Sequence, residues 1–188
     1  QNPLLGYRGA NRIITDDLVF NVELDCLSEA RHKLNCKNIS VIIPMVRSVD
    51  EFAAVKRKIA AQGLSRSPSF LIYADLSTPA ASSLIPSLSN IGLDGIFVNL
   101  DNLAALILRY DPHNAEVSRL IDIKHPAVIK ILTDITNVSS QSNLPVIVTA
   151  FQIEQQPEAV EVVIEAGISG ISISPHRIDS VKSWVHAS

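Results

Sequence analysis

Short apolar runs alternate with amphipathic segments along the whole chain. The apolar runs are rich in β-branched residues and are bounded by polar ones, which is typical of strands buried on both faces. Five such strands are predicted, at residues 40–46, 69–76, 94–100, 144–151 and 170–175. In most of the segments between them, apolar positions recur every three or four residues, and this spacing predicts helices. The predicted helices span residues 16–35, 48–63, 78–92, 101–110, 125–140, 157–167 and 179–188.

Capping residues and apolar stripes set the expected ends and buried faces of these helices. Ser48 precedes the second helix with Glu51 at capping-box spacing, and Asp101 is the expected cap of the helix after the third strand. In the first helix, we expect a stripe of apolar positions to face the core. The stripe consists of Val19, Val22, Cys26, Leu27, Ala30 and Leu34.

Apolar strands that alternate with amphipathic helices predict an α/β fold with a parallel sheet. The 188 residues suffice for one domain with its own core, so residues 1–188 are expected to form a single domain. A complete eight-stranded barrel takes roughly 250 residues. Two architectures therefore stay open: a small doubly wound domain, or the later part of a barrel whose first strands lie elsewhere. Because the chain starts with Gln1 and not with Met, we expect it to be cut from a longer protein.

Composition narrows the range of partners. A formal net charge of −3 argues against nucleic acid or an anionic membrane as the main partner. No apolar stretch reaches the 18 residues that a membrane span needs. Cys26 and Cys36 lack metal-ligand spacing, and we interpret them as buried or idle thiols in preference to a disulfide or a ligand pair. A reducing cytoplasm is the expected compartment.

Polar residues follow several of the predicted strands. Arg47, Ser77, Asp101 and Thr149 all stand at or just after the carboxyl ends of strands. Both parallel architectures place their functional sites at that edge of the sheet. The alternative is that such residues only cap the helices that follow, as Ser48 and Asp101 are expected to do.

Four segments carry a resemblance to a known family. "NPLLGYRGANR" and "IPMVRSVDEF" resemble the two arginine motifs of phosphoenolpyruvate (PEP) synthase, pyruvate phosphate dikinase and enzyme I of the sugar phosphotransferase system. "DGIFVNLDNLAALIL" and "EAGISGISISP" are similar to two later motifs of the same family, in the same order, so that the resemblance extends from Asn2 to Pro175. PEP synthase is the member that the chain resembles most.

The resemblance implies a C-terminal barrel that binds PEP or pyruvate and whose first strands are missing here. In the family, a phosphohistidine on a separate domain donates its phosphoryl group to pyruvate enolate. The overall reaction of PEP synthase converts ATP, pyruvate and water to PEP, AMP and phosphate. Arg8 and Arg47 match the motif arginines, with Arg12 as a third candidate, and a guanidinium suits phosphate oxygens chemically.

The family's magnesium positions are substituted. Ser77 takes the place of one carboxylate ligand and Asn102 the place of the other. Asp75, two residues before Ser77, would need a local shift to serve, and Asp101 is the one plausible replacement beside Asn102. Because magnesium prefers hard oxygen ligands that include carboxylates, we expect weak or absent magnesium binding.

The acid–base position is substituted as well. Thr149 stands where the family has a cysteine that exchanges a proton with the methyl carbon of pyruvate. An unassisted aliphatic hydroxyl does not exchange protons near neutral pH. We therefore expect this copy to be catalytically impaired, and inactive by itself because it lacks the other domains. The alternative is a non-catalytic domain for ligand binding, regulation or dimerisation; family relatives commonly form homodimers through this domain.

Overall fold

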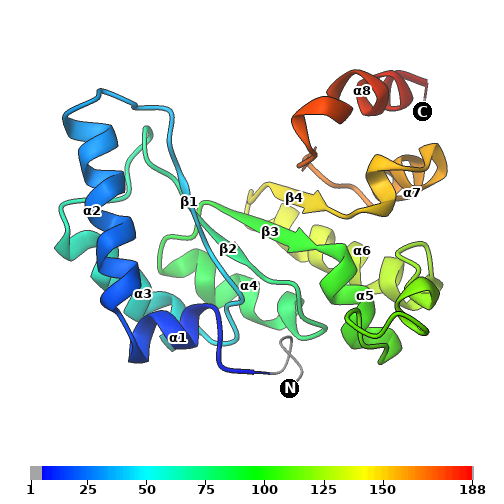
Figure 1. Cartoon of the computed structure of the whole chain (residues 1–188), viewed down its shortest axis with the longest axis horizontal. Helices are drawn as coiled ribbons and strands as arrows, with labels where there is room; N and C mark the ends of the chain where they lie inside the picture. Colours follow the sequence, from blue (N-terminus) through cyan, green and yellow to red (C-terminus); the bar gives the residue numbers. More distant parts are fainter. Residues whose placement is uncertain (1–5, 188) are drawn as a thin grey trace.

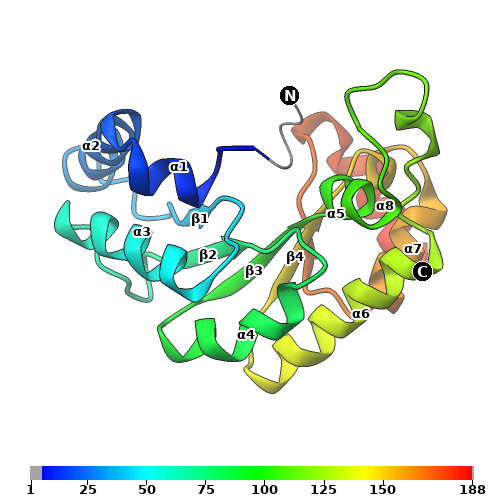
Figure 2. The ribbon, with the colours of Figure 1, turned by 90° about the horizontal axis from the view of Figure 1, so that it is seen from below.

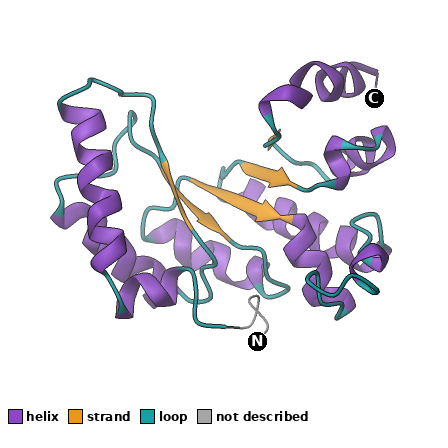
Figure 3. Cartoon of the chain, viewed as in Figure 1, coloured by secondary structure: helices purple, strands orange, loops and turns teal. Residues whose placement is uncertain are grey.

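The computed structural model describes residues 6–187 of the chain. Five parallel strands form one sheet (Figures 1 and 3). The strands are β1 (Val41–Ile43), β2 (Ile72–Asp75), β3 (Gly95–Asn99), β4 (Val146–Thr149) and β5 (Gly170–Ile171). All five correspond to predicted strands, although each is shorter than the apolar run that predicted it.

The spatial order of the strands, β1-β2-β3-β4-β5, is the same as their order in the sequence. Crossovers between parallel strands are right-handed, so strands added in one direction place their helices on one side of the sheet. Figure 2 shows α3, α4 and α6 following one another along that side. A doubly wound sheet would instead reverse its direction at a switch point. The order therefore favours the barrel-type arrangement of the two that the sequence left open.

Helices occupy every segment where the sequence predicts one. They are α2 (Leu18–His32), α3 (Val49–Ala61), α4 (Ala81–Asn90), α5 (Leu100–Leu108), α6 (Pro126–Gln141), α7 (Pro157–Glu165) and α8 (Ile178–Ala187). The short helix α1 (Ala10–Thr15) and three single 3₁₀ turns, η1 (Ser118–Leu120), η2 (Gln152–Glu154) and η3 (Pro175–Arg177), were not predicted. Within residues 6–187, no helix combines the length and apolar character needed to cross a membrane.

The two faces of the sheet differ in burial. Side chains on the helix-covered face are almost fully buried: Ile72, Ala74, Ile96, Val98, Val146 and Val148. On the opposite face, Tyr73, Phe97 and Ile147 are half-buried and Ile42 is 46% exposed. The strands are thus apolar on both faces, as predicted, but within the described residues only one face is fully covered.

The capping predictions are half right. The Ser48 hydroxyl accepts a hydrogen bond from the Glu51 amide at 3.1 Å, as the capping box requires. The cap of α5 is Asn99, whose side chain accepts from the Asn102 amide at 3.0 Å, and the prediction of Asp101 was wrong. Helix α5 starts one residue earlier than expected, which places Asp101 inside its first turn.

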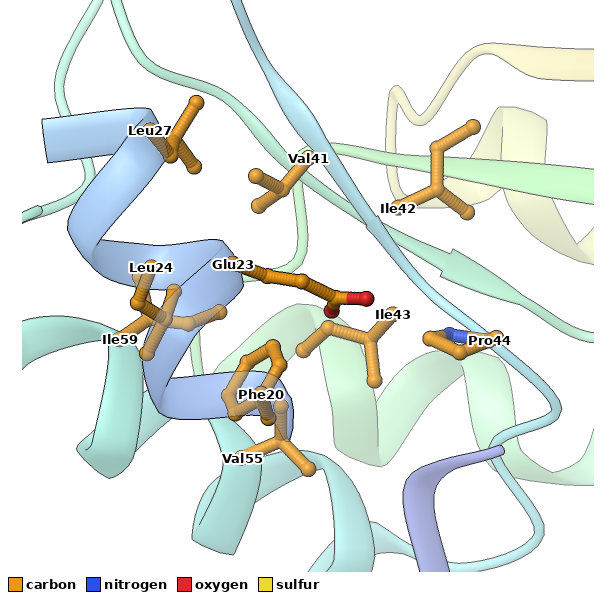
Figure 4. Close-up of a pocket in the computed structure, with 10 residues that line it drawn as sticks. All are labelled: Phe20, Glu23, Leu24, Leu27, Val41, Ile42, Ile43, Pro44, Val55 and Ile59. Carbon is orange, nitrogen blue, oxygen red and sulfur yellow. The ribbon is translucent and has the colours of Figure 1, made fainter. Parts of the chain in front are cut away.

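The predicted buried stripe of α2 is right at Leu27, which packs against the core, and wrong at most of its other positions. Val19 and Val22 are more than half exposed, and Cys26 is exposed as well. The helix instead turns Phe20, Leu24 and Leu27 toward β1 and α3, around a cavity of about 260 Å³ that Glu23 also lines (Figure 4). Apolar residues occur on two sides of this helix, so periodicity alone could not identify the side that meets the sheet.

Arg31 fixes the loop that leads from α2 to β1. Its side chain is buried, its guanidinium lies 4.7 Å from the centre of the Phe70 ring, and it donates to the carbonyls of Lys37 and Ile39 at 3.2 and 2.9 Å. Carbonyl acceptors and the face of an aromatic ring thus compensate for the burial of this charge.

Gly9 allows α1 to approach the loop after β1. Its backbone has φ 66° and ψ −143°, close to a region that only glycine occupies readily. A Cβ at this position would lie 2.7 Å from the Met45 Cβ and 2.8 Å from the Pro44 carbonyl oxygen. The next residue, Ala10, is fully buried and donates its amide to that same carbonyl at 2.8 Å.

We predict that Gly9→Ala destabilises the protein by about 2–3 kcal/mol, because it adds backbone strain and a steric clash. Gly63→Ala is the matched control: Gly63 also has a positive φ, of 75°, but a Cβ there would meet no atom within 4 Å. The control should cost only about 1 kcal/mol. Urea denaturation of the two variants measures both values, and equal losses would contradict the close approach of Gly9 to Pro44.

Candidate functional site

The carboxyl ends of the parallel strands bring the predicted polar residues to one edge of the sheet. Arg47 follows β1, Ser77 follows β2, Asp101 follows β3 and Thr149 ends β4. Their separation in the sequence is large, and parallel pairing alone brings them together. The contacts that each side chain makes at this edge define what the site can do.

Arg47 joins the two arginine segments. Its Nη1 donates to the carbonyl oxygens of Arg8 and Met45 at 3.3 and 3.4 Å, and its Nη2 donates to the Gly6 carbonyl at 3.4 Å. The main-chain amide of Arg47 donates to Glu51 Oε2 at 2.8 Å. Hydrogen bonds therefore fix both the backbone and the side chain of Arg47. Arg8 and Arg47 are 39 residues apart in the sequence and adjacent in the structure.

The three candidate arginines all have exposed side chains. Arg8 lies in the segment before α1, Arg12 lies in α1, and Arg47 lies between β1 and α3. No carboxylate forms an ion pair with Arg47 among the described residues. An exposed guanidinium beside a second arginine segment is suited to an anion such as a phosphate or a carboxylate.

Ser77 takes part in a buried network that joins β1, β2 and β3. Its hydroxyl donates to Asp75 Oδ1 and accepts the Asn99 amide at 2.7 Å. Asp75 Oδ1 also accepts the Ser77 amide at 3.1 Å, and Asp75 Oδ2 accepts the Met45 amide at 3.2 Å. Both side chains are buried. Both hydrogen bonds of the Ser77 hydroxyl are therefore made within the protein, one to a strand-end amide and one to a carboxylate.

Asp101 makes the corresponding contact between β3 and β4. Its Oδ2 accepts the Phe151 amide at 2.8 Å, just beyond the end of β4. Burial raises the pKa of Asp101, and the hydrogen bond from Phe151 lowers it in part. Thr149 is half-buried on β4 and pairs in register with Asn99. The carboxylate of Asp101 therefore connects the first turn of α5 with the segment that follows β4.

Glu154 makes the last contact of this kind, between β4 and β5. Its Oε1 accepts both the amide and the hydroxyl of Ser174, at 2.8 and 3.0 Å. Hydrogen bonding from the Ser174 amide is the main cause that lowers the pKa of Glu154, and His176 and Arg177 lower it further.

Sequence reasoning missed the roles of Asn99 and Glu154 and assigned Asp75 only a conditional one. A signal for two of them was present. In a strand, alternate residues share a face, so Asp75 and Asn99 belong with the half-buried Tyr73 and Phe97 on the open face of the sheet. For Glu154, the 3₁₀ turn that carries it had no recognisable pattern.

The substituted metal positions do not fit a magnesium ion. Among residues 6–187, no group of three or more His, Cys, Asp or Glu side chains is placed to hold a metal. Asp75 already accepts three hydrogen bonds of the roughly four that a carboxylate can accept, and Asp101 accepts one from the backbone. A neutral hydroxyl and a neutral amide replace the carboxylates that the cation prefers.

Comparison with known proteins gives one family over the whole chain. Residues 1–188 match the model of a family described as "PEP-utilising enzyme, PEP-binding domain". The phosphoenolpyruvate synthases of Pseudomonas aeruginosa and Escherichia coli are each 26% identical to the chain, over 180 and 187 residues. These alignments cover 95% and 98% of this chain but 23% of each relative. The chain thus spans about a quarter of the length of these relatives.

Solved structures with a similar fold come from proteins of low sequence identity. A Haloferax volcanii malate synthase, solved as a lead(II) complex, aligns with a TM-score of 0.65 at 12% identity, over 88% of this chain and 49% of that one. RipC from Yersinia pestis aligns with a TM-score of 0.58 at 11% identity, over 90% of this chain and 72% of that one. These likenesses show a shared fold and nothing about activity.

The two acidic strand-end contacts predict opposite effects of pH on stability. The pKa of Asp101 is raised in the folded protein, so ionisation of its carboxyl group opposes folding. The resulting loss of stability grows as pH rises through that pKa. We predict that Asp101→Asn gains stability relative to wild type between pH 4 and pH 7. The amide oxygen of asparagine still accepts the Phe151 amide.

Glu154→Gln is the matched comparison. Glu154 has a lowered pKa when folded, so its ionised form supports folding above the unfolded pKa, and this support is lost as pH falls through the folded pKa. Melting temperatures of both variants across pH 3–8 test the pair. The Gln variant should be less stable than wild type at pH 7 and approach it in acid. The same sign for both variants would contradict the assignment.

Proposed function

The chain belongs to the PEP-utilising enzyme family, and on this basis we propose that it binds the three-carbon anion PEP or pyruvate at its arginine edge but contributes little or no catalysis. The family match and the phosphoenolpyruvate synthase relatives identify it as a C-terminal, PEP-binding domain of a PEP synthase-like protein. Because the chain spans a quarter of those relatives, the activity of a whole protein, its transferase chemistry and its partners are part of this proposal.

The juxtaposition of Arg8 and Arg47 is the observation that carries the proposal. A permanently charged guanidinium binds phosphate or carboxylate oxygens through two parallel hydrogen bonds, and it needs no metal to do so. PEP carries both groups, so two neighbouring arginine segments can contact one ligand at two ends. Arg12 is the third candidate, since it lies on the exposed side of α1.

The same edge supports the proposal of impaired catalysis. Magnesium, when bound in this family, supplies positive charge beside the substrate, but the residues here do not provide its carboxylate ligands. Ser77 and Asn102 are neutral, and Asp75 and Asp101 are engaged with backbone amides. We therefore propose that the arginines alone neutralise the charge of the ligand.

Thr149 supports impaired catalysis independently of the metal. Proton exchange with a methyl carbon requires a group that ionises near neutral pH, and an aliphatic hydroxyl does not. Within residues 6–187, no hydrogen bond joins the Thr149 hydroxyl to a carboxylate or an imidazole; the carboxylates of Asp101 and Glu154 accept from Phe151 and Ser174. In a whole protein, the family's phosphohistidine domain would be the partner of this edge.

A regulatory or dimerising role without turnover is the second candidate, favoured by the apolar residues that α2 leaves exposed.

We predict that PEP binds the wild-type chain equally well with and without magnesium. Arg8→Ala and Arg47→Ala should each weaken binding about 10- to 100-fold, because each removes a charge-assisted hydrogen bond to the ligand. Isothermal titration calorimetry in the presence of magnesium chloride or of a chelator measures all of these values. Arg57→Ala, which removes an exposed arginine in the middle of α3, is the matched control and should bind like wild type.

Three results would contradict separate parts of the proposal. Binding that needs magnesium would show that the substituted residues still hold the metal. Binding that is unchanged in Arg8→Ala and Arg47→Ala would show that the anion lies elsewhere. In the same preparations, the methyl protons of pyruvate should not exchange with D₂O faster than in buffer, and accelerated exchange would contradict impaired catalysis.

A further inference from the structure

We propose that the cavity between α2 and β1 binds a small primary alkylammonium ion, with the ammonium group at Glu23 and the alkyl chain among the apolar walls (Figure 4). The proposal does not depend on the function proposed above for the arginine edge. Val41 and Ile43 pair in register with Ile72 and Ala74, which belong to the helix-covered face of the sheet. The ligand would therefore bind beneath α2, and not on the open face.

The size and the walls of the cavity suit a short alkyl chain. Side chains from α2, α3 and β1 form most of its surface: Phe20, Leu24, Leu27, Ile43, Val55 and Ile59. Leu24, Ile43, Val55 and Ile59 are almost fully buried, so close packing with the core holds this part of the wall in place. At about 30 Å³ for each water-sized group, a volume of 260 Å³ has room for an unbranched chain of about four to six carbons.

Glu23 is the one charged residue among those that line the cavity in the described part of the chain. Its side chain extends from α2 toward β1 (Figure 4). Glu23 is exposed to solvent, and within residues 6–187 its carboxylate takes part in no ion pair or hydrogen bond. An exposed carboxylate beside apolar walls is complementary to an ion with a positive head and an apolar tail.

The charges along α2 favour a cation over an anion of the same length. Residues 13–30 carry five carboxylates and no lysine or arginine. Two of the carboxylates are paired with lysines from outside this stretch, Asp17 with Lys58 and Glu29 with Lys33. Even with these pairs, the stretch keeps a net negative charge, which attracts cations and repels anions.

Three ligands of equal chain length separate the effect of charge from that of apolar burial. We would titrate n-pentylammonium, n-pentanol and pentanoate into ¹⁵N-labelled protein and follow the amide signals of Leu24 and Val41, which report on the cavity and not on the arginines. We expect n-pentylammonium to bind about threefold more tightly than n-pentanol, and pentanoate to leave both signals in place. Equal affinities of the ammonium ion and the alcohol would overturn the proposal, and so would binding of pentanoate at these two amides.

The length of the alkyl chain tests the cavity itself. From propylammonium to pentylammonium, each added methylene should strengthen binding about three- to fourfold, because it buries a further apolar group. Leu27→Phe places a larger side chain in the wall and should weaken binding of pentylammonium at least tenfold, while amides of β3 and β4 keep their wild-type signals. Affinities that do not change with chain length would overturn the proposal.

Two variants on the surface of α2 test the role of Glu23 without disturbing the core. Glu23→Gln should weaken binding of pentylammonium about threefold and leave that of pentanol unchanged, because only the ammonium ion loses its counter-charge. Glu29→Gln is the matched control: it removes a carboxylate from the same helix, away from the cavity, and should bind both ligands like wild type. Equal losses in the two variants, or no loss in Glu23→Gln, would overturn the assignment of Glu23.

Discussion

Backbone amides at the carboxyl ends of the strands need acceptors, and side chains of neighbouring strands supply them. After its last hydrogen bond to the neighbouring strand, each strand is followed by a loop or a helix. A buried backbone amide left there without an acceptor would lower the stability of the fold. Asp75 accepts the amide of Met45, just after β1, and Ser77 accepts the amide of Asn99, at the end of β3. Asp101 accepts the amide of Phe151, just after β4, and Glu154 accepts the amide of Ser174, beyond β5. This series of contacts connects all five strand ends at the edge where a parallel sheet places its functional site.

The same constraint explains why the two halves of the site differ. A carboxylate that accepts a strand-end amide has fewer oxygens to offer a cation, and a serine in place of a carboxylate offers no charge. The arginines are not subject to this limit. Arg47 uses only part of its guanidinium on main-chain carbonyls. On this basis we propose that the edge binds anions through its arginines, while its acidic groups maintain the geometry of the strands.

Much of this arrangement could be predicted from the sequence, and the rest depends on contacts between distant residues. The five strands and seven of the helices follow from local periodicity, and parallel pairing then brings Arg47, Ser77, Asp101 and Thr149 to one edge. Periodicity failed at α2, because apolar residues lie on two of its sides and only the packing against β1 and α3 selects one. It also failed at Asp101, whose position one residue inside α5 directs it to Phe151. The attachment of Gly6 and Arg8 by Arg47 spans some forty residues, and no local pattern encodes it.

Paramagnetic broadening by manganese(II) tests most directly whether the strand-end carboxylates are unavailable to a cation. Manganese takes oxygen ligands like those of magnesium, and it broadens amide NMR signals close to it. The contacts of Asp75, Ser77 and Asp101 predict that manganese leaves the amide signals of Met45, Asn99 and Phe151 no broader than those of exposed residues elsewhere, with PEP absent or present. Selective broadening of these three signals would show that a cation binds among the strand ends, and it would contradict the account.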